Sequence, residues 1–158
     1  MVLHIGQPAP EFTLTNSAGA TVSLADLLGK WIVLYFYPKD NTSGCTREAV
    51  DFSGLLPSFK KHHARIIGIS PDPPKSHTGF IAKHDLRIEL LSDPDHTVCS
   101  LYGVWRKKKL YGKEYFGVVR TTLLIDPAGT IRHLWEKVRV PGHAAAVRER
   151  LASCRRTA

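Results

Sequence analysis

Short apolar runs alternate along this chain with amphipathic stretches, a pattern typical of the α/β fold class. The run at residues 31–36, Trp-Ile-Val-Leu-Tyr-Phe, is apolar throughout. Such a run is expected for a strand that is buried on both faces of a parallel sheet. Residues 45–62 follow with apolar side chains at helical spacing. The alternation continues with predicted strands at 65–70 and 89–92 and predicted helices at 75–84 and 95–102.

Two hairpins are predicted on either side of this central part. The first joins residues 12–14 to residues 21–24 through a short polar turn at the N-terminal end. The second joins residues 117–126 to residues 130–137, and its connection, Asp-Pro-Ala-Gly, is a type I or type II turn signal. We therefore expect a central mixed β-sheet, flanked by helices, with an N-terminal hairpin.

The chain is predicted to end in a helix and a polar tail. Pro141 suits the first turn of this helix, where a missing backbone N–H costs nothing. The side chains of Ala144, Val147 and Leu151 would then face inward. No repeat, low-complexity tract or linker interrupts the 158 residues. We expect a single domain at residues 1–158, with a basic tail at about 150–158.

Much of the formal net charge of +8 lies in two clusters, at residues 106–109 and 148–156. A positive field of this kind attracts nucleic acid, anionic surfaces or anionic partners. The basic residues are not interleaved with the aromatic pattern of a known nucleic-acid module. We therefore expect a solvated basic surface rather than a dedicated nucleic-acid site.

Several function classes are disfavoured. No apolar run approaches the length of a membrane span, and the N-terminus lacks the pattern of a signal peptide. Three widely spaced cysteines argue against a secreted disulfide framework, so we expect a cytoplasmic protein. No nucleotide fingerprint appears, and we expect no cofactor. The eight histidines complete no known ligand spacing, so we expect solvated surface histidines and no metal site.

Cys45 is the most informative residue of the chain. It follows a Pro/Asn/Gly-rich loop, which itself follows the predicted strand at 31–36. A helix that begins at Cys45 places its thiol at a helix N-terminus, at the carboxyl edge of the sheet. The unpaired backbone N–H groups and the helix dipole stabilise a thiolate at such a position. The sequence therefore predicts a nucleophilic sulfur.

A thiolate can attack the O–O bond of a peroxide, and the loop before Cys45 contains groups suited to binding one. Thr42 lies three residues earlier, where its hydroxyl can face the sulfur. The N–H groups of Gly44 and Cys45 can bind a peroxide oxygen as an oxyanion hole does. Pro38 can shield the sulfur from water without presenting a competing donor. A cation is still needed beside the thiolate, and a later strand can supply it.

These residues form a pattern that resembles the active-site motif of the peroxiredoxins. The match is Pro38-x-x-x-Thr42-x-x-Cys45 followed by Thr46-x-Glu48. The sequence of the whole loop is similar to that of the bacterioferritin-comigratory, or Q-type, subfamily. Further matches cover nearly the whole chain: Gly6-x-x-Ala9-Pro10-x-Phe12, Tyr111-Gly112-Lys113 and Gly117-x-x-Arg120-x-Thr122-x-Leu124-Ile125-Asp126.

The resemblance implies a thioredoxin-like fold and the reduction of hydrogen peroxide or organic hydroperoxides. Cys45 would become a sulfenic acid, which a thiol then reduces. In the family, the arginine at the position of Arg120 helps activate the peroxidatic cysteine. Glu48 lies on the helix of Cys45 and can pair with Arg120. An equally open interpretation makes Glu48 a surface acid near the helix N-terminus.

The chain departs from many Q-type members in its other thiols. Their resolving cysteine lies either five residues after the peroxidatic one, which is Val50 here, or on the next helix, where Ile81 matches. Neither position holds a thiol. We therefore expect a one-cysteine cycle, in which an external thiol such as thioredoxin, glutaredoxin or a small thiol reduces the sulfenic acid.

The two remaining cysteines lead to different expectations. Cys99 falls among apolar residues of a predicted helix, and we expect an inert core thiol. Cys154 falls in the polar tail, and we expect it to be exposed. It either resolves Cys45, across a dimer or after movement of the tail, or is an incidental surface thiol.

Two other functions compete with the peroxidase. A peroxide sensor would pass its oxidation to a client protein, and the missing resolving thiols are compatible with that. A non-catalytic binding module of thioredoxin fold would use the basic surface. The joint presence of Pro38, Thr42, Cys45 and Arg120 argues against a module that has lost its chemistry. Similar Q-type proteins imply a monomer or a weak dimer.

Overall fold

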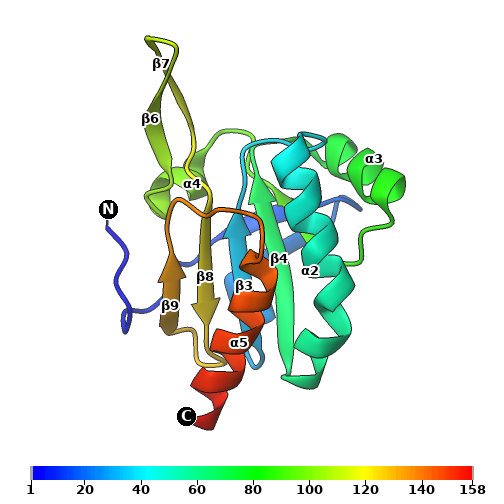
Figure 1. Ribbon diagram of the computed structural model, residues 1–158, viewed down its shortest axis with the longest axis vertical. Helices are drawn as coiled ribbons and strands as arrows, with labels where there is room; N and C mark the ends of the chain where they lie inside the picture. The colour runs from blue at the N-terminus through cyan, green and yellow to red at the C-terminus, as the bar shows by residue number, and fades with distance from the viewer. Residues whose placement is uncertain (1, 158) are drawn as a thin grey trace.

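The computed structural model describes residues 2–157 and shows a twisted sheet covered by helices on both faces (Figure 1). The seven strands of this sheet run in the order β2-β1-β5-β4-β3-β8-β9. Their bounds are Thr13–Asn16 (β1), Thr21–Ser23 (β2), Trp31–Phe36 (β3), Ala64–Ser70 (β4), Glu89–Ser92 (β5), Thr121–Ile125 (β8) and Ile131–Trp135 (β9). The helices are Leu24–Leu27 (α1), Ser43–Lys61 (α2), Pro74–His84 (α3), Thr97–Leu101 (α4) and His143–Arg156 (α5).

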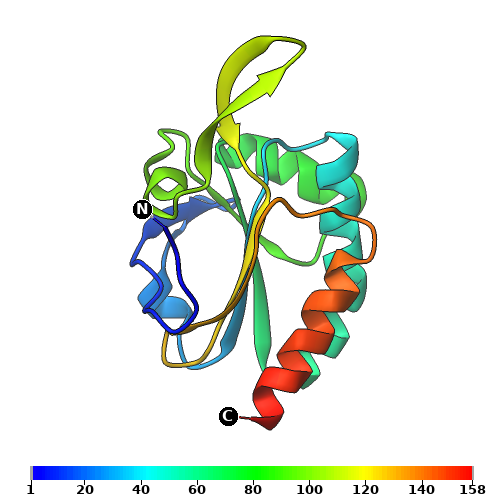
Figure 2. The same ribbon diagram turned by 60° about the vertical axis from the view of Figure 1, so that its left-hand side comes forward.

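Strand β3 lies at the centre of the sheet and is buried along its whole length. It pairs in parallel with β4 and antiparallel with β8, so the sheet is mixed, as predicted. Because side chains alternate between the faces of a strand, β3 contributes to two separate cores. Trp31, Val33 and Tyr35 pack with α2, α3 and α5, and the intervening residues pack with α1, α4 and the N-terminal segment. Figure 2 shows α2 and α5 on one side of the sheet and the N-terminal segment on the other.

A second, two-stranded sheet projects beyond the end of the central sheet (Figures 1 and 2). It consists of β6 (Trp105–Leu110) and β7 (Lys113–Val118). The sequence analysis did not predict this hairpin, because most of its residues are exposed and its first strand is a run of cations rather than an apolar alternation. The predicted strand at 117–126 is therefore wrong as one element: it breaks at residues 119–120 into β7 and β8.

The ends of the two long helices also differ from expectation. Helix α2 begins at Ser43, with Thr42 as its N-cap, so Cys45 is its third residue rather than its first. Pro141 lies just before the N-cap of α5, Gly142. The predicted tail is wrong, because α5 continues to Arg156 and Cys154 is only 9% exposed. Cys154 extends the inward-facing stripe of Ala144, Val147 and Leu151 at helical spacing, which is why it is buried.

The structure also tests the membrane expectation in part. None of the helices within residues 2–157 is long and apolar enough to cross a bilayer.

Candidate active site

Cys45 lies in the first turn of α2, at the carboxyl end of β3, and is 1% exposed. The N-cap residue Thr42 makes no side-chain cap to this turn within the described chain. Its hydroxyl instead donates to the carbonyl of Lys39 at 2.8 Å. The first-turn N–H groups, which have no partners inside the helix, are therefore not occupied by the cap. They are available to an oxygen bound beside the sulfur.

Arg120 supplies the cation that lies beside the sulfur. It lies in the break between β7 and β8, and its carbonyl accepts a hydrogen bond from the N–H of Val138 at 3.0 Å. Its guanidinium points at the first turn of α2: Nη2 donates to the Sγ of Cys45 at 3.3 Å, and Nη1 donates to Oε1 of Glu48 at 2.7 Å. This contact places a positive charge directly beside the sulfur, where it can stabilise negative charge that develops there.

Glu48 is a buried partner of Arg120 and not a surface acid, so that alternative is wrong. It lies one helical turn after Cys45, on the same face of α2, and is 1% exposed. Burial raises the pKa of the Glu48 carboxyl to about 7, although the charge of Arg120 acts to lower it. Its Oε2 has no hydrogen-bond partner among residues 2–157. Glu48 therefore orients Arg120 at a cost in desolvation.

Gly44 allows the guanidinium to approach the helix. A Cβ placed on Gly44 would lie 3.3 Å from Nη2 of Arg120, closer than ordinary contacts. Glycine is therefore the residue type that leaves room for the bond between Arg120 and Cys45.

Replacing Gly44 by alanine is expected to slow the reaction of Cys45 with peroxide by about tenfold, because the guanidinium must move away from the sulfur. Stability should stay constant or rise by up to about 1 kcal/mol, since alanine is the better helix former. Gly54→Ala is the matched control on the same helix, because no atom lies within 4 Å of its added Cβ. Stopped-flow oxidation and thermal unfolding measure the two effects, and equal rates for the two variants would contradict the steric argument.

The remaining loop residues precede the first turn of α2. Pro38 is half-buried where β3 ends, and Thr42 is exposed. The hydroxyl of Thr42 donates its proton to the carbonyl of Lys39, so it cannot also donate to a ligand. The hydroxyl oxygen still has lone pairs that can accept a hydrogen bond from a peroxide. Arg120 thus reaches the thiol of Cys45 from a position 75 residues later in sequence.

The other two cysteines lie away from this site, and the three thiols form no disulfide. Cys99 is fully buried, as predicted, and burial beside Asp93 raises its pKa strongly, so it is an inert thiol. Cys154 lies in the last turn of α5. Nη1 of its neighbour Arg155 lies within hydrogen-bond distance of Nδ1 of His62, at 2.9 Å, and His62 is the C-cap of α2. Since α2 is 19 residues long, Cys154 lies at its far end, about 25 Å from Cys45.

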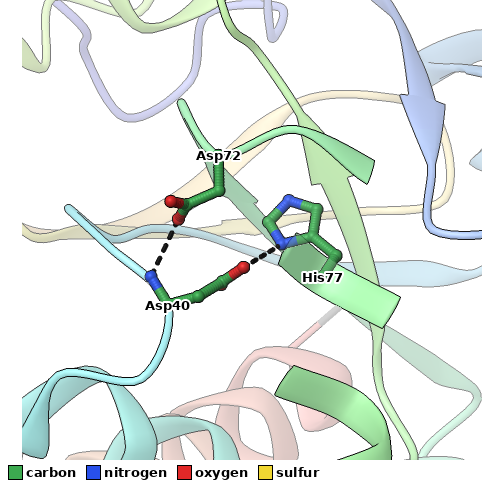
Figure 3. Close-up of side chains that lie close together, drawn as sticks. All are labelled: Asp40, Asp72 and His77. Atoms are coloured by element: carbon green, nitrogen blue, oxygen red, sulfur yellow. Dashed lines mark hydrogen bonds and ion pairs between the residues drawn. The ribbon is translucent and has the colours of Figure 1, made fainter. Parts of the chain in front are cut away.

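Two histidines contradict the expectation that all are solvated. His77 and His143 are 0% and 6% exposed. Burial and the charge of Arg120 lower the pKa of His143 to about 4, so it is neutral near pH 7 and pairs with the hydroxyl of Thr122 at 2.8 Å. His77 belongs to a buried polar cluster with Asp40, which lies in the loop between β3 and α2 (Figure 3).

The sequence analysis missed two features near the site. One is the cluster of Asp40 and His77, for which the only signal was a charged residue following a fully buried strand. The other is Lys108, which was expected within a solvated basic surface. Lys108 is half-buried on β6, and burial and the like charge of Arg120 lower its pKa. Its charge also interacts with that of Cys45, so the hairpin brings a second cation toward the sulfur.

Comparison with known proteins agrees with the geometry. The profile of the AhpC/TSA family matches residues 5–134. A putative peroxiredoxin Bcp of Helicobacter pylori is 48% identical over 149 residues, 94% of this chain and 98% of that protein. Peroxiredoxin Bcp of Bacillus subtilis is 48% identical and covers 92% of each chain. A solved structure of Xanthomonas campestris bacterioferritin comigratory protein has a TM-score of 0.86, with 43% identity over 90% of each chain.

The chain belongs to the AhpC/TSA family, and its fold and site define it as a peroxiredoxin, a thiol-dependent peroxidase of thioredoxin-like fold. Within that class it is a peroxiredoxin of the Bcp, or Q, type. The expectations for fold, family and activity are thereby confirmed.

Proposed function

We propose that Cys45 runs a one-cysteine peroxidase cycle that an external thiol completes. The observation that supports it most directly is the position of the Arg120 guanidinium, which donates hydrogen bonds to both the sulfur of Cys45 and the carboxylate of Glu48. A cation in contact with a buried sulfur keeps it nucleophilic, and a fixed acid keeps the cation in place. The resemblance assigns Cys45 the nucleophilic role, and the geometry is consistent with that assignment.

In the first step the Cys45 thiolate attacks one oxygen of the peroxide. The S–O bond forms as the O–O bond breaks, and the leaving oxygen takes up a proton to depart as water or an alcohol. The sulfur is oxidised to a sulfenic acid. Arg120 and the N–H groups of the first turn of α2 stabilise the charge that develops on the oxygens. Thr42 accepts the hydrogen bond of the peroxide, and Pro38 limits access of water.

In the second step an external thiol attacks the sulfenic sulfur, releasing water and forming a mixed disulfide. A second thiolate then releases Cys45 in its reduced form, and the two electrons end in the disulfide of the reductant. The distance between Cys45 and Cys154 and the burial of Cys99 support an external source for both thiols. Thioredoxin, glutaredoxin and small thiols are the candidate reductants. The reducing environment that such a cycle requires supports a cytoplasmic enzyme, and we propose a monomer or a weak dimer.

Both hydrogen peroxide and organic hydroperoxides are proposed substrates. The Xanthomonas campestris relative was studied for alkyl peroxide reduction, which supports organic hydroperoxides for this chain as well.

Peroxide consumption with dithiothreitol tests the cycle directly. Cys45→Ser is expected to abolish activity over background, because the nucleophile is lost. The double variant Cys99→Ser, Cys154→Ser should keep turnover within about twofold of wild type, since neither thiol takes part. A large loss in the double variant, together with a disulfide to Cys45 on non-reducing gels, would replace the one-cysteine cycle with an internally resolved one. Assays with thioredoxin and glutaredoxin systems then identify the reductant.

A further inference from the structure

The loop at residues 37–42, called the catalytic loop below, is tied to α3 through a buried polar cluster. Figure 3 shows three members of this cluster. Asp40 lies in the loop five residues before Cys45, and His77 lies on α3; they are 5% and 0% exposed. Their closest atoms, Oδ2 of Asp40 and Nδ1 of His77, are 2.8 Å apart. The proposed peroxidase cycle assigns no role to either residue.

Further hydrogen bonds hold both side chains of this pair in place. Nε2 of His77 lies 3.0 Å from the carbonyl of Leu91, which only accepts, so Nε2 carries a proton. Asp40 accepts from the hydroxyl of Tyr37 at 2.6 Å and from the hydroxyl of Ser76 at 2.8 Å. Nδ1 of His77 shares a hydrogen bond with the same carboxylate, so the two side chains form one buried, hydrogen-bonded pair. Burial acts to raise the pKa of Asp40, but the bonds from His77 and Tyr37 outweigh it and lower the pKa.

The backbone of Asp40 is held as firmly as its side chain. Its N–H donates to Oδ2 of Asp72 at 2.8 Å, and that oxygen also accepts from the hydroxyl of Ser70 at 2.7 Å. Ligand atoms of Asp40, Asp72 and His77 lie within 4.8 Å of one another, a spacing at which a cation can be bound. Protein donors already occupy both oxygens of Asp40 and Oδ2 of Asp72, so the cluster holds together without an ion.

Asp40 is also the last residue of the catalytic loop that the cluster holds before α2 begins. Asn41 follows it with a φ of 63°, in the left-handed region that non-glycine residues rarely adopt. Thr42 is then the N-cap of α2, and its hydroxyl donates to the carbonyl of Lys39. Asn41 alone therefore separates Asp40, and with it the buried pair, from Thr42. Any loosening at Asp40 shifts Thr42 and the first turn of α2 relative to Arg120, which lies elsewhere in the chain, in the break between β7 and β8.

We propose that Asp40 and His77 are positioning residues, whose buried hydrogen-bonded pair fixes the catalytic loop to α3 and so holds Thr42 and the first turn of α2 in the geometry that binds peroxide. This inference rests on the proposed peroxidase function. The pair acts through the loop, because neither side chain contacts the sulfur. It affects the binding and orientation of peroxide, whereas the thiolate itself is held by Arg120.

Two rates measured on each variant test this role. One is the oxidation of Cys45 by hydrogen peroxide in a single turnover, and the other is its alkylation by iodoacetamide, which needs the thiolate but no peroxide pocket. Asp40→Ala should slow oxidation by about 10- to 100-fold, a range typical of a misplaced reacting group. Alkylation should stay constant or become faster, as the sulfur becomes less enclosed. Asp40→Asn should recover most of the oxidation rate, because the asparagine amide can accept from Tyr37 and donate to Nδ1 of His77.

Phe80→Leu is the matched control for a purely structural effect. Phe80 is fully buried on the same helix and packs near Tyr37, but it forms none of the bonds of the cluster. It should lower the melting temperature while leaving the oxidation rate unchanged. Unchanged oxidation in Asp40→Ala, or equal losses of oxidation and alkylation, would overturn the proposal.

A variant that does not fold would not block the test. If Asp40→Ala fails to fold, His77→Gln takes its place, with an expected loss in oxidation of about tenfold and normal alkylation. A wild-type oxidation rate in His77→Gln would then refute the positioning role. Cys45→Ser distinguishes the two possible failures. If the proposed peroxidase function fails, wild type consumes peroxide no faster than Cys45→Ser. If only the positioning role fails, wild type remains faster than Cys45→Ser.

Discussion

Replacing Arg120 by glutamine is expected to slow the oxidation of Cys45 by peroxide by about 100- to 1000-fold, the usual effect of removing one donor to a developing negative charge. Glutamine can reach only one of the two groups that the guanidinium bridges, Cys45 or Glu48. It also leaves the buried carboxylate of Glu48 without a counter-charge. Stopped-flow measurement of the second-order rate constant with hydrogen peroxide, at a temperature where the variant is folded, gives the loss directly.

Two further variants separate charge from geometry at Arg120. Arg120→Lys keeps the charge but loses the planar fork, so it should recover only part of the rate. Alkylation by iodoacetamide should fall in Arg120→Gln as well, because the thiolate has lost its partner; this distinguishes it from the Asp40 variants. Arg132→Gln is the surface control, since Arg132 pairs with Asp126 and lies over the ring of Trp31, away from the thiol. An Arg120→Gln rate within a few fold of wild type would remove Arg120 from the mechanism.

The sequence carries strong information about the central sheet and weak information about everything that projects from it. Strands β3, β4 and β5 were predicted at nearly their observed bounds, because burial on both faces demands apolar side chains. The β6–β7 hairpin is exposed on both faces, so its residues carry no such requirement. For Cys154, arginines nearby suggested an exposed tail, but the spacing from Leu151 is that of a buried helical stripe.

The candidate site shows the same division. The motif placed Cys45, Thr42 and Pro38 in one loop, and these are local in sequence. Whether Glu48 faces Arg120 or solvent depends on how β8 lies beside the first turn of α2, which only the folded chain determines. The pair of Asp40 and His77 likewise joins a loop to a helix 37 residues later, and neither residue carries a local pattern that indicates burial.

Glu48→Gln is expected to make the protein more stable at about pH 8, although it removes an acid from the active site. The carboxyl has an ordinary pKa of 4.5 and a pKa of about 7 in the folded protein. The folded state therefore holds the proton more tightly, and the free energy of unfolding falls as the pH rises through this window. Above it, the ionised carboxyl costs about 3 kcal/mol relative to the neutral form. Glutamine resembles the neutral form and avoids this cost.

Urea unfolding of both proteins at pH 5 and pH 8 checks the prediction. The two proteins should differ little at pH 5, where Glu48 is mostly protonated in the folded state, and by up to about 3 kcal/mol in favour of Glu48→Gln at pH 8. Glu149→Gln, at an exposed position on α5, is the control and should show no such pH-dependent gain. A Glu48→Gln variant less stable than wild type at pH 8 would mean that the bond to Arg120 outweighs the cost of burial.

The activity of the same variant shows why a costly acid is retained. The glutamine side chain in Glu48→Gln can still accept a hydrogen bond from Arg120, but this bond is weaker because the acceptor no longer carries a charge. The guanidinium is then held less firmly beside the sulfur, and oxidation by peroxide should slow by about tenfold even though the protein is more stable. Gain of stability with loss of rate is the expected signature of an acid that serves the reaction at the expense of the fold. Gain of stability with an unchanged rate would leave Glu48 without a role in positioning Arg120.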